Sequence, residues 1–361
     1  IETSNIIDQS GTRSVDAKRN TETKKISVDQ KIFQGFQGYN NFKKSRLEFE
    51  KAKNEYKQVE QDTILNSVSA YYDLIFKNKS KDFNLANVDL FERQVESDRS
   101  RLQKGEISLT DLAQSESSLA GAQAAFIKAD SEYISAIAEF ERVNRVSSPK
   151  ALNDNFDVSF IMPQSLKNAL ELSNSNNPSL AIARINLAIS ERELNVEKAR
   201  LSPSATLNYS KTENKDLSAT IDEDEKETVK ATVSWPIIQG GKNFSSIKKF
   251  RHKKEKNSLL LEDKENEIKT QTATSWSFFQ SAESILASTE AQLKAAEIAN
   301  EGITLEYDSG NTRTTLEVIQ SRSLLLEARI SNAEAKKDFI ISKMRLLSQI
   351  GGLDLKAFKT P

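Results

Sequence analysis

Cysteine is absent from this chain of 361 residues, and histidine occurs once, at His252. Without cysteine there is no disulfide framework, no thiolate metal site and no thiol nucleophile. Long apolar runs are missing too. The nearest is a short run at 119–127, well below the roughly 20 apolar residues that a membrane-spanning helix needs. If the chain crosses a membrane, strands must make the crossing.

A surplus of one charge is also lacking, since 51 lysines and arginines stand against 52 aspartates and glutamates. Nucleic-acid-binding surfaces need a basic surplus, so we expect no nucleic-acid partner. Enzyme signatures are missing as well: there is no histidine pair, no nucleophile elbow and no phosphate-binding glycine loop. We therefore predict no enzymatic activity, no cofactor and no metal site.

Helix breakers are few, with 6 prolines and 11 glycines, while charged residues make up 29% of the chain and the mean hydropathy is -0.56. This composition favours long, exposed helices over compact mixed domains.

An internal repeat organises the chain. A shift of 205 residues brings the two halves into register, and each half then follows one plan: strand, polar loop, strand, very long helix, glycine-containing turn and half-length helix. The matching pairs include Gly35 with Gly240, Lys43 with Lys248, Lys44 with Lys249, Arg46 with Arg251, Tyr71 with Trp276, and Gly105 with Gly310. Residues 163–203 have no counterpart in the first half. We therefore expect that roughly 40 residues and a signal peptide precede Ile1.

Alternating apolar and polar residues predict amphipathic strands at 26–32, 205–211 and 228–236, and residues 1–10 are a weaker fourth candidate. A small sheet on a soluble domain and a transmembrane barrel both fit such strands. However, four strands cannot close a barrel, whose smallest form has about 8, and an open sheet edge cannot face lipid. The barrel interpretation thus requires several copies of the chain. The polar segment 211–228 is predicted as a solvent-exposed hairpin loop.

Long helices are predicted at 36–104 and 242–309, each about 100 Å long at 1.5 Å per residue. Residues 111–148, 164–202 and 313–350 are predicted as helices of about half that length. Two half-length helices placed end to end match one long helix, so the chain should supply a uniform wall rather than a globule.

Apolar residues recur every 3.5 positions in these helices, which is the rhythm of coiled coils. In 111–148 one seam runs through Leu112, Ser115, Leu119, Ala122, Phe126, Ala129, Tyr133 and Ala136, and in 313–350 another runs through Leu316, Ile319, Ser323, Leu326, Ile330 and Ala333. A solid bundle and a hollow tube both fit such seams. Small residues away from the seam, such as Ala120 and Ala124, favour the tube because they offer a second packing face.

Five segments, in this order and spacing, resemble the outer-membrane efflux protein family, the TolC-like proteins. They are 30–36 (QKIFQGF), 101–119, 169–207, 234–241 (SWPIIQGG) and 305–329. The resemblance implies a mainly α fold with a small membrane β part. In that fold, long antiparallel coiled-coil helices form an α-helical barrel, and four strands per protomer contribute to a trimeric, 12-stranded transmembrane β-barrel.

The resemblance also implies a function: a homotrimeric exit duct in the outer membrane of a Gram-negative bacterium, extending into the periplasm. Such a duct belongs to a tripartite efflux or type I secretion system and passively conducts drugs, small molecules or proteins. Its implied partners are a periplasmic adaptor, an inner-membrane pump of RND or ABC type, and outer-membrane lipid. A structural coiled-coil envelope protein and a periplasmic adaptor are the alternative interpretations.

Six regions follow from this resemblance. They are a first β-hairpin (1–35), a first long helix, turn and half-length helix (36–149), a connector with a half-length helix (150–203), a second β-hairpin (204–241), a second long helix, turn and half-length helix (242–350), and a C-terminal tail (351–361).

Site residues are carried over by matching positions. Thr110, Asp111, Tyr307 and Arg313 match the family's periplasmic gate, where a carboxylate can accept from a phenol and pair with a guanidinium. Helix capping is the alternative interpretation for Thr110 and Asp111, since both are suitable residues for a helix start. Two further positions, Glu317 and Gln320, match the acidic rings at the pore constriction, although Gln320 is uncharged here, and the adaptor-docking tips fall at Gly105 and Gly310.

Overall fold

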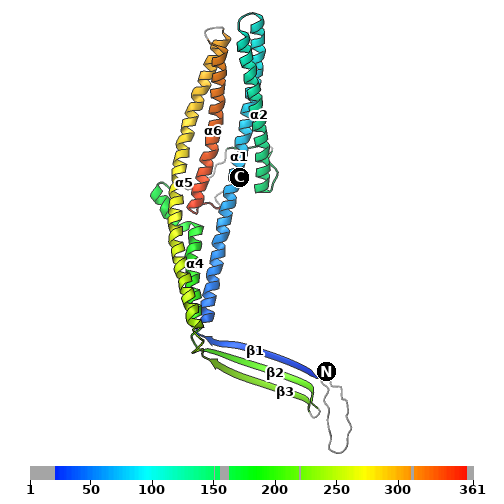
Figure 1. Ribbon diagram of the computed structural model, residues 1–361, viewed down its shortest axis with the longest axis vertical. Coiled ribbons are helices and arrows are strands. Elements are labelled where there is room, and N and C mark those ends of the chain that lie inside the picture. Colours follow the sequence, from blue (N-terminus) through cyan, green and yellow to red (C-terminus); the bar gives the residue numbers. More distant parts are fainter. Residues whose placement is uncertain (1–20, 150, 155–161, 219–220, 310–312, 356–361) are drawn as a thin grey trace, which may run out of the picture. The chain divides into compact units, whose positions relative to one another are not determined.

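The computed structural model describes residues 21–149, 151–154, 162–218, 221–309 and 313–355 of the chain (Figure 1). The chain divides into two compact units. The first unit draws on 1–51 and 183–261, and the second draws on 52–182 and 262–361.

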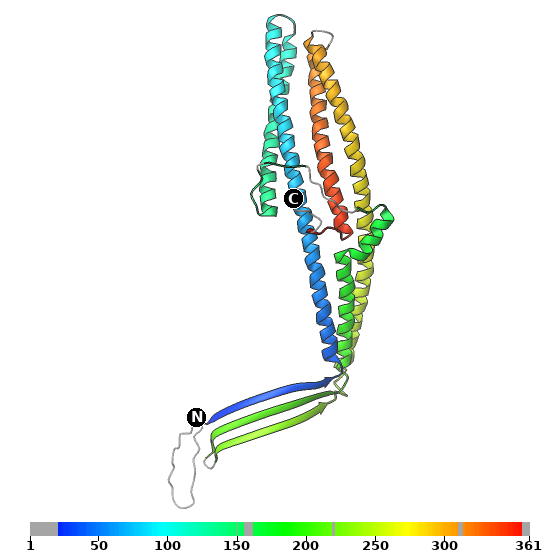
Figure 2. The ribbon, with the colours of Figure 1, turned by 180° about the vertical axis from the view of Figure 1, so that it is seen from behind.

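The sheet of the first unit has the strand order β1-β2-β3 with antiparallel neighbours (Figure 2). β1 spans Glu22–Gln34, β2 spans Ser204–Ser218 and β3 spans Ile221–Ser234. The three stronger strand predictions are therefore confirmed. The fourth candidate, 1–10, lies outside the described residues.

The prediction of an exposed loop over 211–228 was wrong, because β2 and β3 continue to pair through most of that segment. Oppositely charged side chains join β2 to β3 in this part of the ladder: Lys211 forms an ion pair with Glu225, and Lys215 pairs with Glu223 at 3.5 Å. Lys211 also pairs at 3.2 Å with Glu213 of its own strand. Opposite charges on adjacent strands stabilise a sheet. A polar composition therefore does not oppose a strand when its charges alternate in this way.

One face of the sheet exposes apolar side chains. The register puts Val28, Tyr209 and Val229 side by side, and they are 55%, 37% and 70% exposed. The next row, on the opposite face, is polar, and there Asn208 donates to Asp29 at 2.6 Å. The sheet thus has one apolar and one polar side, as the alternation predicted.

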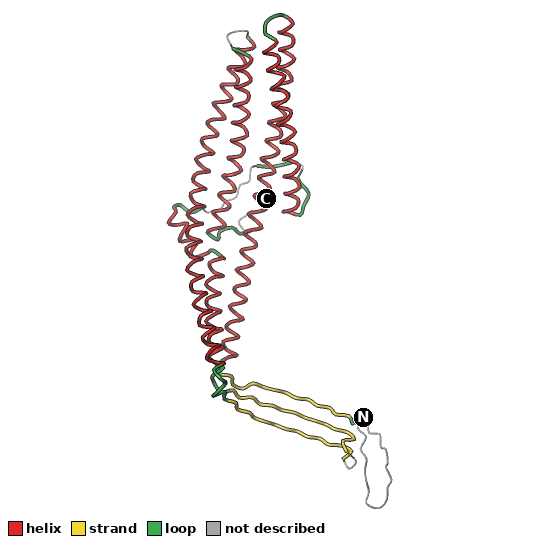
Figure 3. The backbone as a smooth tube through the Cα atoms, viewed as in Figure 1, coloured by secondary structure: helices red, strands yellow, loops and turns green. Residues whose placement is uncertain are grey.

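Two helices of 67 residues each, α1 (Gln37–Gln103) and α5 (Lys242–Asp308), run through both units (Figure 3). The shorter helices are α2 (Leu109–Asn144), α3 (Leu166–Asn176), α4 (Pro178–Ala199) and α6 (Thr315–Gln349). α2 returns along α1, and α6 returns along α5, so each pair forms a helical hairpin. The predicted long helices are thereby confirmed. Among the described helices, none combines the length and apolar character needed to cross a membrane.

The predicted helix over 164–202 is broken in two at Asn177. This residue has extended backbone, its Oδ1 accepts from the backbone N–H of Leu180 at 3.1 Å, and its Nδ2 donates to the carbonyl of Gln349 at 2.9 Å. Pro178 begins α4, where its missing N–H costs nothing and its fixed φ suits a helix start. It also disfavours helical backbone in the residue before it. An Asn-Pro pair therefore ends one helix and starts the next.

The predicted seam of α2 is confirmed by burial at intervals of seven, at Ser115, Ala122, Ala129 and Ala136. The predicted seam of α6 is confirmed only in part. Ile319 and Ala333 are buried, but Leu316 is 44% exposed, and a second buried stripe includes Val318, Ser321, Leu325, Ala328, Asn332, Ala335 and Ser342.

The reason is that α6 contacts helices on two sides. Asn332 donates to Thr289 of α5 at 3.3 Å, while Ile319 packs with Val88 of α1 and Ala122 of α2. A helix with two sets of neighbours buries two adjacent stripes of residues. A search for one seven-residue seam then picks residues from both stripes and follows neither.

β1 leads into α1 through two residues with positive φ, Gly35 (58°) and Phe36 (65°). A Cβ on Gly35 would lie 2.5 Å from the carbonyl oxygen of Ala199 and 2.5 Å from Cβ of Ser202. Gly240, which the repeat aligns with Gly35, has a similar φ of 54° but open space around it. The first junction therefore needs glycine both for its backbone conformation and for its close approach to the end of α4.

We expect Gly35→Ala to lower the stability of the full-length protein by about 1–3 kcal/mol more than Gly240→Ala does, because only Gly35 adds a clash to the backbone strain. Gly38→Ala, at an open helical position, should be neutral or slightly stabilising. Urea unfolding in detergent, followed by circular dichroism, measures the three differences. Equal losses for Gly35→Ala and Gly240→Ala would contradict the clash.

Candidate functional site

A buried carboxylate joins the loop ends of both helical hairpins in the second unit. Asp98 of α1 is 0% exposed, and its Oδ1 accepts from the hydroxyl of Tyr307 at 2.9 Å and from the amide of Gln94 at 3.0 Å. Its Oδ2 accepts from the hydroxyl of Ser115 at 2.5 Å. The hydroxyl of Tyr307 also lies 3.1 Å from that of Thr315. We name these five residues the tip cluster; α1, α2, α5 and α6 all contribute to it.

Tyr307 is the link between the hairpins. It is 5% exposed, next to the last residue of α5, and the guanidinium of Arg101 lies 4.6 Å from its ring centroid. Burial, above all, raises the pKa of Tyr307. The phenol therefore keeps its proton around neutral pH and donates it to Asp98.

A second link between the hairpins comes from Arg322 of α6. Its Nη1 donates to the backbone carbonyl of Leu90 in α1 at 3.1 Å. Burial lowers the pKa of this guanidinium, while Asp308 and Asp98 act in the opposite direction. The side chain remains a cation, since an arginine does not lose its charge in a protein.

Asp111 and Thr110, both predicted gate residues, lie at the start of α2. Asp111 forms a capping box with Ser108: its carboxylate accepts from the Ser108 hydroxyl at 2.7 Å and from the Ser108 N–H at 2.9 Å. The hydroxyl bond is the first cause of a lowered pKa for Asp111, and the N–H bond is the second. Thr110 is exposed. Within one chain, Tyr307 therefore meets Asp98 rather than Asp111.

Arg313, the fourth predicted gate residue, lies between two carboxylates just before α6. It pairs with Glu306 at 2.6 Å and with Glu317 at 3.0 Å. Glu317 also caps the helix, because it accepts from the N–H of Thr314 at 2.8 Å. This backbone bond first, and then Arg313, lowers the pKa of Glu317. Gln320 is exposed one turn further along α6.

The predicted docking tips are the two hairpin turns. Gly105 has a φ of 73° and open space around it, so a side chain there would strain only the backbone. Gly310 lies outside the described residues.

Sequence reasoning missed Asp98 and Gln94. Ser115 was already predicted to lie in the buried coiled-coil seam. A hydroxyl at a buried position needs a hydrogen-bond partner, and this was the available signal of a polar site there. Asp98 gives no such signal, because an aspartate on a polar helix is expected to face water. Only the contact between two hairpins about 200 residues apart in sequence explains its burial.

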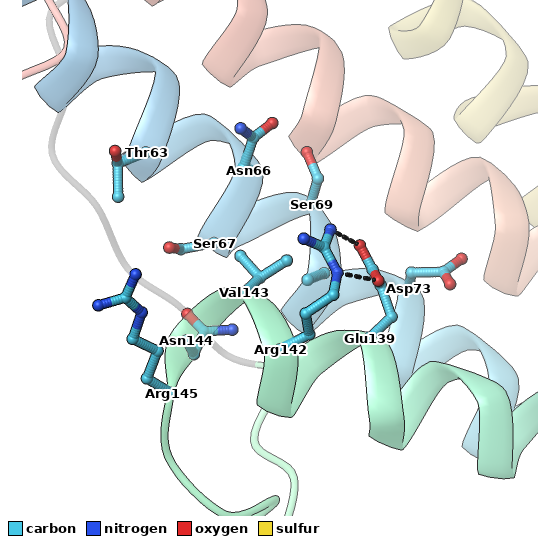
Figure 4. Close-up of a pocket in the computed structure, with 11 residues that line it drawn as sticks. Thr63, Asn66, Ser67, Ser69, Asp73, Glu139, Arg142, Val143, Asn144 and Arg145 are labelled. Atoms are coloured by element: carbon cyan, nitrogen blue, oxygen red, sulfur yellow. Dashed lines mark hydrogen bonds and ion pairs between the residues drawn. The ribbon is translucent and has the colours of Figure 1, made fainter.

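A polar hollow of ≈ 880 Å³ lies elsewhere in the second unit, between α1 and the end of α2 (Figure 4). The guanidinium of Arg142 is already held there by the carboxylate of Glu139, through two bonds of 2.7 and 2.6 Å. Among the described residues there is no group of three or more acidic or histidine side chains that could hold a metal. Nothing in the hollow converges on a ligand, so the hairpin ends are the better candidate for the functional site.

Comparison with known proteins identifies the family of this chain. The family model for the outer membrane efflux protein matches residues 7–143 and 169–352. The chain belongs to this family. It is 24% identical to the outer membrane efflux protein BepC of Brucella suis over 334 residues, which cover 92% of this chain and 73% of BepC. It is 21% identical to the alkaline protease secretion protein AprF of Pseudomonas aeruginosa, over 91% of this chain and 69% of AprF.

The fold agrees with this membership. The crystal structure of the outer membrane protein VceC from Vibrio cholerae superposes with a TM-score of 0.76 at 14% identity, covering 97% of this chain and 85% of VceC. As a family member, the protein is an outer-membrane efflux channel with a periplasmic extension, of the kind used in tripartite efflux and type I secretion, and it is not an enzyme. Family channels form trimers and work with efflux partners. The alternatives of an envelope coiled coil and a periplasmic adaptor are thereby set aside.

We expect Tyr307→Phe to destabilise the protein by about 1–3 kcal/mol, because it removes a donor from the buried carboxylate of Asp98. Tyr72→Phe is the matched control: Tyr72 is 6% exposed, and its hydroxyl has no hydrogen-bond partner among the described residues. A double-mutant cycle of Tyr307→Phe and Asp98→Asn, measured by urea unfolding, should show a coupling energy of about 0.5–3 kcal/mol. A coupling energy of zero would rule out the Tyr307–Asp98 bond.

Proposed function

We propose that three copies of this chain form one exit duct, closed at its periplasmic end by the tip cluster of each copy. Four strands from each copy, namely β1, β2, β3 and the predicted strand over 1–10, join into one 12-stranded barrel in the outer membrane. The helices continue it as a hollow barrel across the periplasm. The observation that carries the closed tip is the bond from Tyr307 to buried Asp98, which ties one helical hairpin to the other.

The sheet supports the trimer. Within the described residues β1 and β3 each pair with β2 alone, so the outer backbone groups of both strands have no partner there. Lipid cannot supply hydrogen bonds to these groups, but the edge strand of another copy can. Closure by identical copies removes the edges.

The helices support a hollow wall. Phe278, Ile285 and Ile298 of α5 are 57%, 51% and 64% exposed, although each is large and apolar. Rows of this kind mark surfaces that pack against a neighbour. Helices of adjacent copies would cover them, as a tube requires and as a bundle within one chain does not.

The proposed partners follow the family. A periplasmic adaptor docks on the hairpin turns at Gly105 and Gly310, and an inner-membrane pump of RND or ABC type delivers the cargo. One relative is named for efflux and another for protease secretion. The proposed cargo therefore includes both small molecules and proteins.

Opening means separating the hairpin of α5 and α6 from that of α1 and α2. Each of the hydrogen bonds to a charged group in the tip cluster contributes about 1.5–3 kcal/mol. Three copies repeat these bonds around the axis. An adaptor that binds the separated hairpins more tightly than the joined ones would shift the channel toward the open state.

Glu317 supplies the proposed constriction ring. Its three copies would place three carboxylates around the pore and attract cations. Arg313 offsets part of this field, because it pairs with Glu317 and Glu306 together. Since Gln320 carries no charge, the cation preference should be modest.

Combining Tyr307→Phe with Arg313→Ser should raise the single-channel conductance of the full-length protein in planar bilayers, because it removes the bond to Asp98 and the ion pairs at α6. The control combines Tyr72→Phe with Arg142→Ser, a buried phenol and a surface arginine outside the tip cluster. Equal conductance in the unaltered protein and the tip variant would reduce these residues to structural roles.

Glu317→Gln should move the reversal potential under a salt gradient toward zero cation preference, and Gln320→Glu should move it the other way. Glu171→Gln, on α3, serves as the control. The lowered pKa of Glu317 sets the pH range over which the cation preference is lost. The preference should persist below the ordinary glutamate pKa of about 4.3 and vanish only as the pH falls through the lower folded value. The helix cap that needs the ionised form weakens over the same range. A reversal potential unaffected by Glu317→Gln would exclude the ring.

A further inference from the structure

Large apolar side chains are exposed where the strands of the first unit meet its helices. Phe36 is 70% exposed, Trp235 62%, Ile238 89% and Phe244 70%. In a soluble protein, so dense a group of exposed apolar side chains marks a binding surface. These residues lie directly after the apolar face of the sheet, at the ends of β1 and β3.

The backbone at Phe36 carries strain that holds its ring outward. Its φ of 65° lies in the left-handed region, which bulky residues rarely adopt. The ring meets only Phe33 edge-on, with centroids 5.8 Å apart. Strain of this kind persists where the surroundings or a function require it.

Cations without carboxylate partners follow these apolar residues in the first turns of both long helices. In the described part of the chain, no carboxylate lies within ion-pair distance of Lys43, Arg46, Lys242, Lys248, Lys249 or Arg251. The first acidic residue of α1 is Glu48, and that of α5 is Glu255. Lys43 contacts only the ring of Tyr39, at 5.5 Å.

The next two lysines of α5 are paired. Lys253 lies 2.6 Å from Glu193 of α4, and Lys254 lies 2.7 Å from Glu191. Six cations in the turns nearest the sheet thus lack a carboxylate partner among the described residues, whereas Lys253 and Lys254 each have one. The internal repeat places Lys43 and Arg46 at the same positions as Lys248 and Arg251, so both halves of the chain carry unpaired cations there. Lys44, the counterpart of Lys249, is paired with Glu48 at 3.5 Å and with Glu193 at 3.7 Å.

We propose that these residues form a lipid-binding collar: the exposed apolar side chains enter the acyl-chain boundary of the periplasmic leaflet, and the unpaired cations bind the phosphates of anionic phospholipids. Lys248 and Lys249 lie about 10 Å along α5 from its first residue, at 1.5 Å per residue. That distance suits the headgroup layer, and flexible lysine side chains extend toward a charged surface.

Continuity favours lipid over a protein partner or the cell-wall polymer. The collar adjoins a sheet face that is itself apolar and exposed, in a protein of the outer membrane. Trp235 has the amphipathic arrangement of an interfacial residue: its indole N–H donates to the carbonyl of Leu201 at 3.1 Å, while most of its surface is exposed.

Trp235 also provides the test. The chain has two tryptophans, so Trp276→Phe leaves Trp235 as the only one. The full-length protein with this change is reconstituted into vesicles containing dibrominated phosphatidylglycerol or dibrominated phosphatidylcholine, and quenching of Trp235 is compared. We expect a preference for phosphatidylglycerol of roughly fivefold, weakened by salt. Adding Lys248→Gln, Lys249→Gln and Arg251→Gln should bring it close to one.

The control removes the same charge from the same helix, with Lys264→Gln, Lys269→Gln and Lys294→Gln, and should keep the preference. Equal quenching by both lipids in the unaltered collar, or equal loss in the two triple variants, would overturn the collar and leave the proposed barrel intact. Absence of quenching by either lipid would overturn both, because the sheet would then lie outside the bilayer. Capture by purified cell-wall polymer with no lipid preference would also reject the proposal.

Discussion

The hydrogen-bonding needs of the sheet edges constrain everything else in this molecule. A backbone N–H or carbonyl that faces lipid without a partner costs several kcal/mol, so an open edge is not tolerated there. Within the described residues, β1 and β3 each leave one edge open. In the proposed trimer, an edge strand of a second copy supplies these missing hydrogen bonds.

The helices satisfy their backbone hydrogen bonds internally, so packing of their side chains governs how they associate. Their polar surfaces suit water, and narrow seams of small residues, such as Ala122, Ala129 and Ala136, let the helices approach closely. Exposed large residues on α5 remain for a neighbouring copy. In the proposed trimer, assembly buries much of the apolar surface, so no large hydrophobic core is needed within one chain. This explains how a chain with a mean hydropathy of -0.56 can build a membrane channel.

Features with a short period were predictable from the sequence, and features set by contacts between distant segments were not. The alternation in β1 and β3 and the seven-residue seam of α2 each repeat over a few residues, so the sequence displays them directly. The repeat at 205 residues was visible for another reason: matching residues recur in the same order in both halves. The seam predicted for α6 captured only part of its buried surface, because that helix packs against two sets of neighbours. The prediction of a loop over 211–228 was wrong because the cross-strand partners of Lys211 and Lys215 stabilise strand pairing there. Asp98 was missed for the same reason: its burial depends on Tyr307, which lies on the other hairpin.

The chemistry of the tip cluster suits a reversible closure. All three bonds to Asp98 come from neutral donors, two hydroxyls and an amide, rather than from a buried cation. Breaking a buried ion pair leaves an unpaired buried charge, which is strongly unfavourable. A neutral donor can instead replace its hydrogen bond to Asp98 with a hydrogen bond to water. When the hairpins part, water reaches the carboxylate as the phenol leaves, so most of the lost bonding is replaced. In the proposed gate, the closed state would then be held by a modest free energy that a docking protein can exceed.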